Sequence, residues 1–183
     1  GLVIKKIGAE YSPDLLDRLE ILRYLNERGL KIFSSHLSIM RVLDRLSCTI
    51  TLKAADMPME PTLITEDPQA ALGTVEKFGE AVFKPLFSTK ASGMVVIRDD
   101  AGARSVIVNF KKENPMMYIQ KKIDLHGKDM GIVFMGGEYL TTYARVKSEG
   151  AWNTTTRSGG KYESYNPPQE IITLAKNAQA LFN

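Results

Sequence analysis

The sequence of 183 residues has little of several features that mark whole classes of protein. It contains one cysteine, Cys48, so no disulfide can form within the chain, and low cysteine content is typical of the reducing cytoplasm. No apolar run approaches the length of a membrane-spanning helix, and no basic-then-apolar leader precedes the first predicted strand. We therefore expect a cytoplasmic protein without membrane contact.

The low number of histidines and the small excess of basic residues exclude two further classes of function. The two histidines, His36 and His126, lie far apart and lack cysteine, histidine or acidic partners at ligand spacing, which argues against a zinc site. Lysine and arginine number 24 against 21 acidic residues, and they form no contiguous basic run or basic helix face. This pattern argues against a nucleic-acid-binding protein, but it leaves small anions open as ligands.

The residues that are present predict a folded protein of class α/β, built as α+β lobes. Hydrophobic residues make up 44% of the chain, enough for one ordinary domain or two small lobes with a core. A strand is predicted over Gly1–Ile7 and a helix at the other end, so we expect a chain trimmed at both ends.

The first third of the chain predicts a strand-helix-strand unit. Ser12 is the expected N-cap of a helix, Pro13 its first residue and Gly29 its end, and 31–33 is a short strand that we expect to pair in parallel with the first. Leucines at three- and four-residue steps predict one buried helix face. They are Leu15, Leu16, Leu19, Leu22 and Leu25.

Helices and strands are mixed in the rest of the chain. Pro58 and Pro61 predict an extended crossing after a helical stretch over 38–56, and Gly136-Gly137 predicts a two-residue hairpin turn within 132–143. The other predicted elements are strands over 62–64, around 84, over 94–98 and over 116–120, helices over 67–78, 103–112 and from 166, and a polar loop over 147–166.

One segment has the composition of a phosphate site. Phe83-Lys84-Pro85 closes an apolar strand and opens into the small-residue loop 86–93, after which a second strand begins. The lysine supplies a fixed positive charge, and small residues let backbone N–H groups approach an anion. The strand 117–123 follows, with Asp129 just beyond it. Together these segments predict an ATP site between two small sheets.

The order of pieces resembles the ATP-grasp family, and within it the RimK-like ligases that join a carboxylate to an amine, such as those that add glutamate to a protein C-terminus. The resemblance runs from about Gly1 to the end, and it depends on order and spacing rather than on one motif. Its pieces are Asp44-Arg45, Pro61-Thr62, Lys84, Gln120, Asp129, Gly136-Gly137, Ala144-Arg145, Glu149-Gly150-Ala151-Trp152 and Gly159-Gly160.

The resemblance implies two α+β lobes that sandwich a nucleotide, with the remnant of an N-terminal α/β lobe. On this basis residues 1–57 are that remnant with the interlobe helices. Residues 58–122 are the small lobe with the phosphate loop, and 123–183 are the start of the C-terminal lobe. The family's ligands for Mg²⁺, an acid and then a Glu-x-Asn segment, are expected beyond Asn183.

The resemblance also implies roles for single residues. Arg45 and Lys84 would contact the phosphates, Asp129 would lie near the nucleotide, and Arg145 would stabilise charge on the transferred phosphoryl group. The segment that would contact the adenine edge is Gln120, Lys121, Lys122 and Ile123.

Several departures from the family lie in two loops. Ser88 and Ala91 replace two of the three glycines of the phosphate loop, and hydroxyls of Ser88 and Thr89, with Lys90, would compensate. In the polar loop the family's Arg-Ser-Asn triplet is Asn153-Thr154-Thr155, which makes Asn153 and Thr155 the candidate substrate residues.

The implied activity is ATP-dependent ligation through an acyl phosphate, in which catalysis rests on positioning and on charge neutralisation by Mg²⁺, Lys84 and Arg145. The carboxylate and amine substrates are unknown, and a protein or peptide is one candidate. A catalytically impaired nucleotide-binding or regulatory module is the alternative function. Whether the chain forms a homo-oligomer is left open. Each residue also has a simpler interpretation: Lys84 as a solvated charge, Asp129 as a turn residue, and Arg145 as half of an ion pair.

Overall fold

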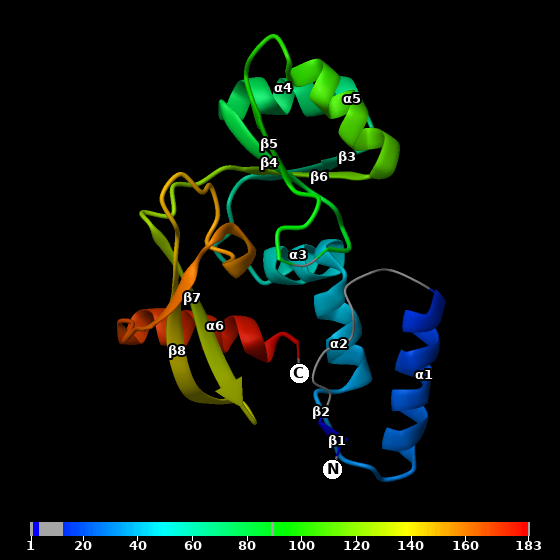
Figure 1. Cartoon of the computed structure of the whole chain (residues 1–183). Coiled ribbons are helices and arrows are strands. Elements are labelled where there is room, and N and C mark those ends of the chain that lie inside the picture. Colours follow the sequence, from blue (N-terminus) through cyan, green and yellow to red (C-terminus); the bar gives the residue numbers. More distant parts are fainter. Residues whose placement is uncertain (1, 4–12, 89, 183) are drawn as a thin grey trace.

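The computed structural model describes residues 2–3, 13–88 and 90–182 of the chain. Figure 1 shows a helical N-terminal part, a small sheet covered by two helices, and a second sheet with one helix. The mixed α/β class expected from the sequence is confirmed. In the described part of the chain, no helix has the length and apolar character needed to cross a membrane.

The N-terminal part is a strand-helix-strand unit, as predicted. Strand β1 (Leu2–Val3) pairs in parallel with β2 (Ile32–Phe33), and α1 (Pro13–Glu27) connects them. Leu15, Leu19 and Leu22 are buried against α2 (His36–Leu43) and β2. The expected N-cap Ser12 and most of the predicted first strand lie outside the described residues.

One leucine of the predicted buried face of α1 was assigned wrongly. Leu16 is 49% exposed, whereas Leu15 beside it is 6% exposed. Consecutive helical residues are about 100° apart around the axis, so the contact of α1 with a single neighbouring layer buries a narrow stripe and leaves Leu16 beside it.

The predicted helical stretch 38–56 is in two pieces, α2 and α3 (Arg45–Ala54). Asp44 separates them, because its carboxylate accepts hydrogen bonds from the backbone N–H groups of Leu46 and Ser47 and so caps α3. This cap makes Arg45 the first residue of α3. Helix α3 lies directly below the small sheet in the view of Figure 1.

The small sheet has the strand order β3-β6-β4-β5, and all its neighbours are antiparallel. Its strands are β3 (Thr62–Thr65), β4 (Glu80–Lys84), β5 (Val95–Arg98) and β6 (Met117–Lys121). Helices α4 (Pro68–Phe78) and α5 (Ala103–Glu113) cover one face. Phe83, Ile107, Met117 and Ile119 are fully buried there, and Phe83 packs edge-on against Phe110.

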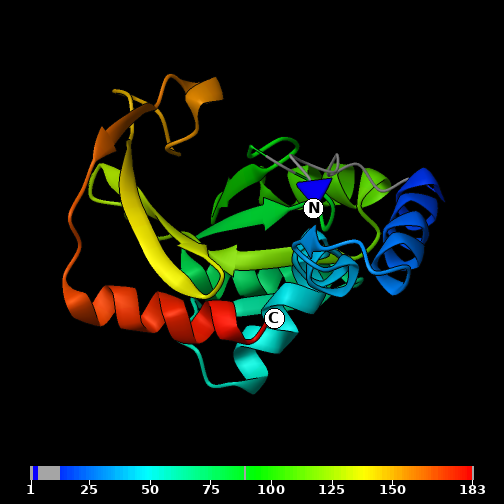
Figure 2. The ribbon, with the colours of Figure 1, turned by 90° about the horizontal axis from the view of Figure 1, so that it is seen from below.

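The second sheet has the order β7-β8-β9. Strands β7 (Lys128–Met135) and β8 (Glu138–Val146) form the predicted hairpin, and positive φ angles of 60° and 84° at Gly136 and Gly137 make its two-residue turn. Helix α6 (Gln169–Ala180) packs on β7 and β8, and its C-terminal end comes near α2 (Figure 2).

The polar loop predicted over 147–166 is partly regular. It contains the short 3₁₀ helix η1 (Thr156–Ser158) and strand β9 (Lys161–Ser164), which pairs with the end of β8. All four residues of β9 are exposed, so they show no apolar alternation by which a strand could have been predicted.

Candidate functional site

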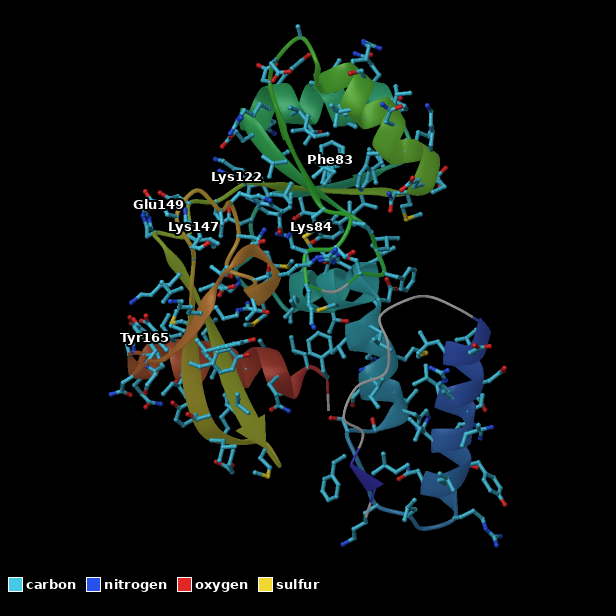
Figure 3. All side chains as sticks on the ribbon, in the orientation of Figure 1. Phe83, Lys84, Lys122, Lys147, Glu149 and Tyr165 are labelled. Carbon is cyan, nitrogen blue, oxygen red and sulfur yellow. The ribbon has the colours of Figure 1, made fainter. Side chains whose placement is uncertain are left out.

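Side-chain alternation divides the small sheet into a core face and a polar face. Phe83 points toward α4 and α5, while its neighbour Lys84 points to the opposite side, toward α3 (Figure 3). Lys84 lies directly opposite Tyr118 on β6, and Gln120 is two residues farther along that strand on the same face. The candidate site is this polar face together with the start of α3.

Arg45 fixes the beginning of the loop that follows β4. Its Nε donates to the carbonyl oxygen of Pro85 at 3.0 Å, and its Nη2 donates to the hydroxyl of Ser88 at 3.0 Å. The backbone N–H of Arg45 also points to the carbonyl of Leu86. The structure thus joins the N-terminus of α3 to the predicted phosphate loop.

Lys84 is held by a chain of side-chain hydrogen bonds. Its Nζ donates to Oε1 of Gln120 at 2.5 Å, and Nε2 of Gln120 donates to the hydroxyl of Thr62 at 3.1 Å. The hydroxyl of Thr62 in turn donates to the carbonyl oxygen of Glu60. The amide of Gln120 is therefore occupied in orienting Lys84.

Both cations lie near the ring of Tyr118. The guanidinium carbon of Arg45 is 5.8 Å from the centroid of this ring, and Nζ of Lys84 is 5.9 Å from it. The ring is held in place because its hydroxyl lies 2.9 Å from the hydroxyl of Thr49 on α3. Both distances are within the range at which a ring attracts a cation.

The electrostatics of this cluster favour an anion. Among the described residues, neither Arg45 nor Lys84 has a carboxylate within ion-pair distance. Burial lowers the pKa of Lys84 to about 8, and the positive charge of Arg45 adds to the shift. Burial also lowers the pKa of Arg45. Two partly buried cations without an acid are stabilised when a negative group binds between them.

The loop after Lys84 borders a small polar cavity. Lys90 and Ala91 have positive φ angles of 55° and 57°, and the turn they form leads into β5. A cavity of about 370 Å³ lies against this turn, with Lys90, Arg157, Trp152 and Asn153 among its lining residues. Trp152 is 38% exposed. The predicted nucleotide contact Thr89 lies outside the described residues.

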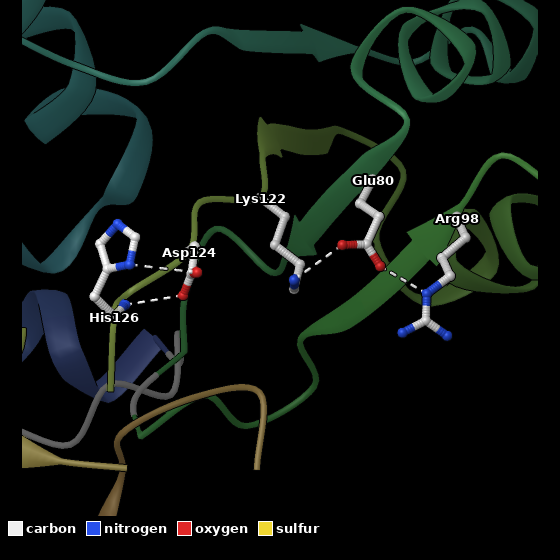
Figure 4. Close-up of polar contacts among 5 residues, drawn as sticks. All are labelled: Glu80, Arg98, Lys122, Asp124 and His126. Carbon is white, nitrogen blue, oxygen red and sulfur yellow. Dashed lines mark hydrogen bonds and ion pairs between the residues drawn. The ribbon is translucent and has the colours of Figure 1, made fainter. Parts of the chain in front are cut away.

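In the segment predicted to contact adenine, residues 120–123, most of the polar groups already bond to the small sheet or to the residues beside it. The backbone N–H of Lys121 donates to Pro61, and that of Lys122 donates to Glu80. Nζ of Lys122 forms an ion pair with Glu80 at 2.9 Å, and Arg98 binds the other oxygen of this carboxylate at 2.6 Å (Figure 4). Hydrogen bonds from Arg98 and Lys122 lower the pKa of Glu80. Ile123, beyond the strand, is 45% exposed.

Asp129 and Arg145 lie opposite each other on β7 and β8 and form a two-pronged ion pair. Nε and Nη2 of Arg145 donate to the two carboxylate oxygens at 2.9 and 2.5 Å. The hydrogen bond to Asp129 raises the pKa of Arg145. None of the hydrogen bonds in the described part of the chain connects this pair with Arg45 or Lys84.

Asn153 and Thr155 are brought together by the polar loop. Oδ1 of Asn153 accepts hydrogen bonds from the backbone N–H and the hydroxyl of Thr155, at 3.0 and 2.7 Å. Thr154 between them is 3% exposed. A Cβ on Gly160 would lie 2.1 Å from the carbonyl oxygen of Thr154, so this close approach of two backbone segments requires glycine.

Three residues of the site were not predicted from the sequence. Tyr118 had a detectable signal, because it alternates with Gln120 on one strand and therefore shares its face. Thr49 had none, and Thr62 was named only within the family pattern Pro61-Thr62, since the contacts of both residues depend on which strand and helix lie beside β6.

Comparison with protein families identifies the family of this chain. Residues 42–182 match the model of the RimK-like ATP-grasp domain. The chain belongs to the RimK-like ATP-grasp family. The matched range includes the whole of the small sheet, the second sheet, α3 and the cation cluster.

Relatives and solved structures agree with this membership in the ATP-grasp family. The tetrahydromethanopterin:alpha-L-glutamate ligase of Methanosarcina acetivorans is 24% identical over 97% of this chain and 58% of its own length. The ATP-grasp ligase PsnB, solved with a variant of its minimal precursor, Mg and ADP, has a TM-score of 0.70 at 15% identity, over 92% of this chain and 51% of that one.

The ATP-grasp fold is also supported by a RimK domain protein from Sphaerobacter thermophilus, with a TM-score of 0.68 at 17% identity over 91% of this chain and 60% of that one. These structural likenesses show the fold. The chain spans little more than half of the length of the proteins that it matches.

Proposed function

We propose that the chain is the nucleotide-binding part of an ATP-dependent carboxylate–amine ligase that forms an amide bond through an acyl phosphate. The observation that carries the proposal is the pair of cations, Arg45 and Lys84, held on Tyr118 beside the loop 86–93 without an acidic partner among the described residues. A triphosphate supplies the negative charge that such a pair lacks.

Within this proposal each residue has a defined task. Lys84, oriented by Gln120, and Arg45, which also anchors Ser88, would bind the phosphates. Arg145 would stabilise the transferred phosphoryl group, with Asp129 holding its guanidinium in a fixed orientation. The exposed Ile123 and the segment around it would lie along the base, and Asn153 and Thr155 would contact the substrate.

Magnesium is included in the proposal because PsnB is solved with Mg and ADP. The described residues contain no group of three or more His, Cys, Asp or Glu side chains that could hold a metal ion, so none of their roles is assigned through it. The relative from Methanosarcina acetivorans is named for glutamate, and PsnB is solved with a precursor peptide, so we propose an amino acid and a peptide or protein as the substrate pair. The cytoplasm stays the expected location.

The test is calorimetric titration of ATP, with and without Mg²⁺, into the protein and its Lys84→Ala variant. We expect the variant to bind at least about tenfold more weakly, a loss of about 1.4 kcal/mol. Lys112→Ala, an exposed lysine on α5, is the matched control and should bind as the unmodified protein does. Equal affinities of all three proteins would contradict the proposed site.

The alternative, a nucleotide-binding module without turnover, is favoured by the loss of two glycines from the phosphate loop. Release of ADP in the presence of glutamate and a short peptide distinguishes the two functions. Turnover that requires both substrates supports the ligase, whereas nucleotide binding without turnover supports the module.

A further inference from the structure

A second cavity lies at the outer edge of the small sheet, and Arg45 and Lys84 are not among its lining residues. It has a volume of about 830 Å³ and lies between α3, α4 and the edge strand β3. Apolar side chains make much of its wall, and one of them, Ile50, is 57% exposed. The apolar lining residues on which the argument rests are Ile50, Ala54, Met59 and Phe78.

The register of β3 shows that its edge carries unused backbone groups directed into this cavity. Lys121 donates its N–H to the carbonyl of Pro61, so the next hydrogen-bonded positions of β3 toward β6 are Leu63 and Thr65. In an antiparallel pair these positions alternate, and the N–H and C=O groups of Thr62 and Ile64 therefore point outward. An outward row of this kind is a template for one more strand.

Charge at the cavity favours an acidic occupant. Lys53 on α3 and Lys77 on α4 line it from opposite sides, and both side chains are exposed. In the ranges that the structure describes, neither lysine forms an ion pair or a side-chain hydrogen bond. Among the described lining residues, Glu60 is the one acidic residue. Two cations that flank an apolar floor attract a segment in which carboxylates alternate with apolar side chains.

We propose that this edge groove, formed by α3, β3 and α4, binds an acidic peptide in extended conformation, which adds a fifth strand beside β3. Backbone hydrogen bonds to Thr62 and Ile64 would set its register. Alternate apolar side chains would fill the groove, and acidic side chains would pair with Lys53 and Lys77. The inference does not require nucleotide binding, because the peptide would use the backbone of Thr62, whereas the hydroxyl of Thr62 accepts from Gln120, and none of the proposed contacts involves Arg45 or Lys84.

The experiment uses a fluorescein-labelled hexapeptide of alternating Glu and Val as the probe, with anisotropy to measure affinity. We expect this peptide to bind and the matched peptide of alternating Lys and Val not to bind. A Glu/Val peptide with N-methyl groups on alternate residues should also fail, because it cannot donate to the edge. Lys53→Glu with Lys77→Glu should weaken binding of the Glu/Val peptide at least tenfold.

Lys31→Glu with Lys112→Glu is the control pair, since both lysines are exposed and lie outside the groove. Amide exchange supplies a second readout: the peptide should slow exchange at Thr62 and Ile64, and leave Leu63 and Thr65, already bonded to β6, unchanged.

Three results would overturn the proposal. They are failure of the Glu/Val peptide to bind at millimolar concentration, equal binding to both pairs of lysine variants, and protection of Thr62 and Ile64 by a concentration-dependent dimer without peptide. The last result would make a second copy of the chain the occupant. The groove can fail any of these tests while ATP binding persists.

Discussion

Lys84 experiences two effects that oppose its charge, burial and the nearby guanidinium of Arg45. The amide of Gln120 and the ring of Tyr118 partly compensate, but neither is an anion. A bound phosphate should therefore stabilise the charged form of Lys84 more than it would stabilise an exposed lysine. Its lowered pKa makes this gain measurable as a dependence on pH.

The first prediction concerns pH and Lys84. Because its pKa is about 8, the amine is mostly charged at pH 7 and loses its proton above pH 8, so ATP affinity should fall between pH 7 and 9. Lys84→Arg should bind with little dependence on pH in this range, since guanidinium does not titrate there. Titration calorimetry at several pH values checks this, and parallel slopes for the two proteins would refute it.

The contribution of Lys84 to folding stability should change with pH in the direction opposite to its contribution to ATP affinity. The folded pKa of Lys84 lies below that of an unfolded lysine, so the unfolded chain binds more protons between about pH 8 and 10.5. The contribution of Lys84 to stability therefore rises with pH in this window. Denaturant melts of the protein and of Lys84→Arg, compared at each pH, isolate that contribution from those of other titrating groups.

The second prediction concerns the ring of Tyr118. Tyr118→Leu removes the surface that holds both cations and should weaken ATP binding about threefold to tenfold, the size of one or two cation–π contacts. Tyr118→Phe keeps the ring and loses the contact with Thr49, so its affinity should stay within about twofold. Thermal melts confirm that both variants are folded, and equal losses would show that the ring has no role of its own.

Some residues of the candidate site could be predicted from the sequence, and others could not. Lys84 could be predicted because its charge and the small-residue loop after it are local properties, whereas Arg45 was implied by the resemblance to the family. The structure brings the two residues together on Tyr118. The ion pairs of Lys122 with Glu80 and of Glu80 with Arg98 could not be predicted, since they form through the pairing of strands distant in sequence. The tasks assigned to single residues stay predictions.

At the scale of elements, local sequence predicted helices and turns better than strands. The start of the helix predicted from residue 67, where Asp67 is the N-cap, and the Gly136-Gly137 turn depend on short-range hydrogen bonds or backbone effects, and both occur as expected. The cap at Asp44 was not predicted from the sequence. Strand β9 depends on pairing with the end of β8, which is a long-range contact. Its exposed residues show no pattern from which that pairing could be predicted.

The third prediction contrasts two glycines in different elements. Gly73 lies within α4 with open space where a Cβ would be, so Gly73→Ala should stabilise the protein by about 0.5–1 kcal/mol. Gly160→Ala would push a methyl group against the backbone at Thr154 and should destabilise by about 1–3 kcal/mol. Thermal and denaturant unfolding should give shifts of opposite sign, and a shift of the same sign in both would contradict this assignment.

At the scale of the whole molecule, the two larger sheets share no strand and are joined by the segment 122–127. The division into 1–57, 58–122 and 123–183 stays a proposal. The cation cluster uses α3 from the first of these parts and β4 and β6 from the second. Residues from both parts are therefore needed for the anion site.

The strand order β3-β6-β4-β5 also has a consequence for synthesis on the ribosome. β6 is the last of the four strands to emerge, yet it lies between β3 and β4, so the nascent chain exposes two unpaired edges until residue 121 has left the exit tunnel. A nascent chain stalled with residues up to 113 outside the exit tunnel should be cut readily by protease. One stalled with residues up to 127 outside should resist, because β6 has closed the sheet and delivered Tyr118 and Gln120 together.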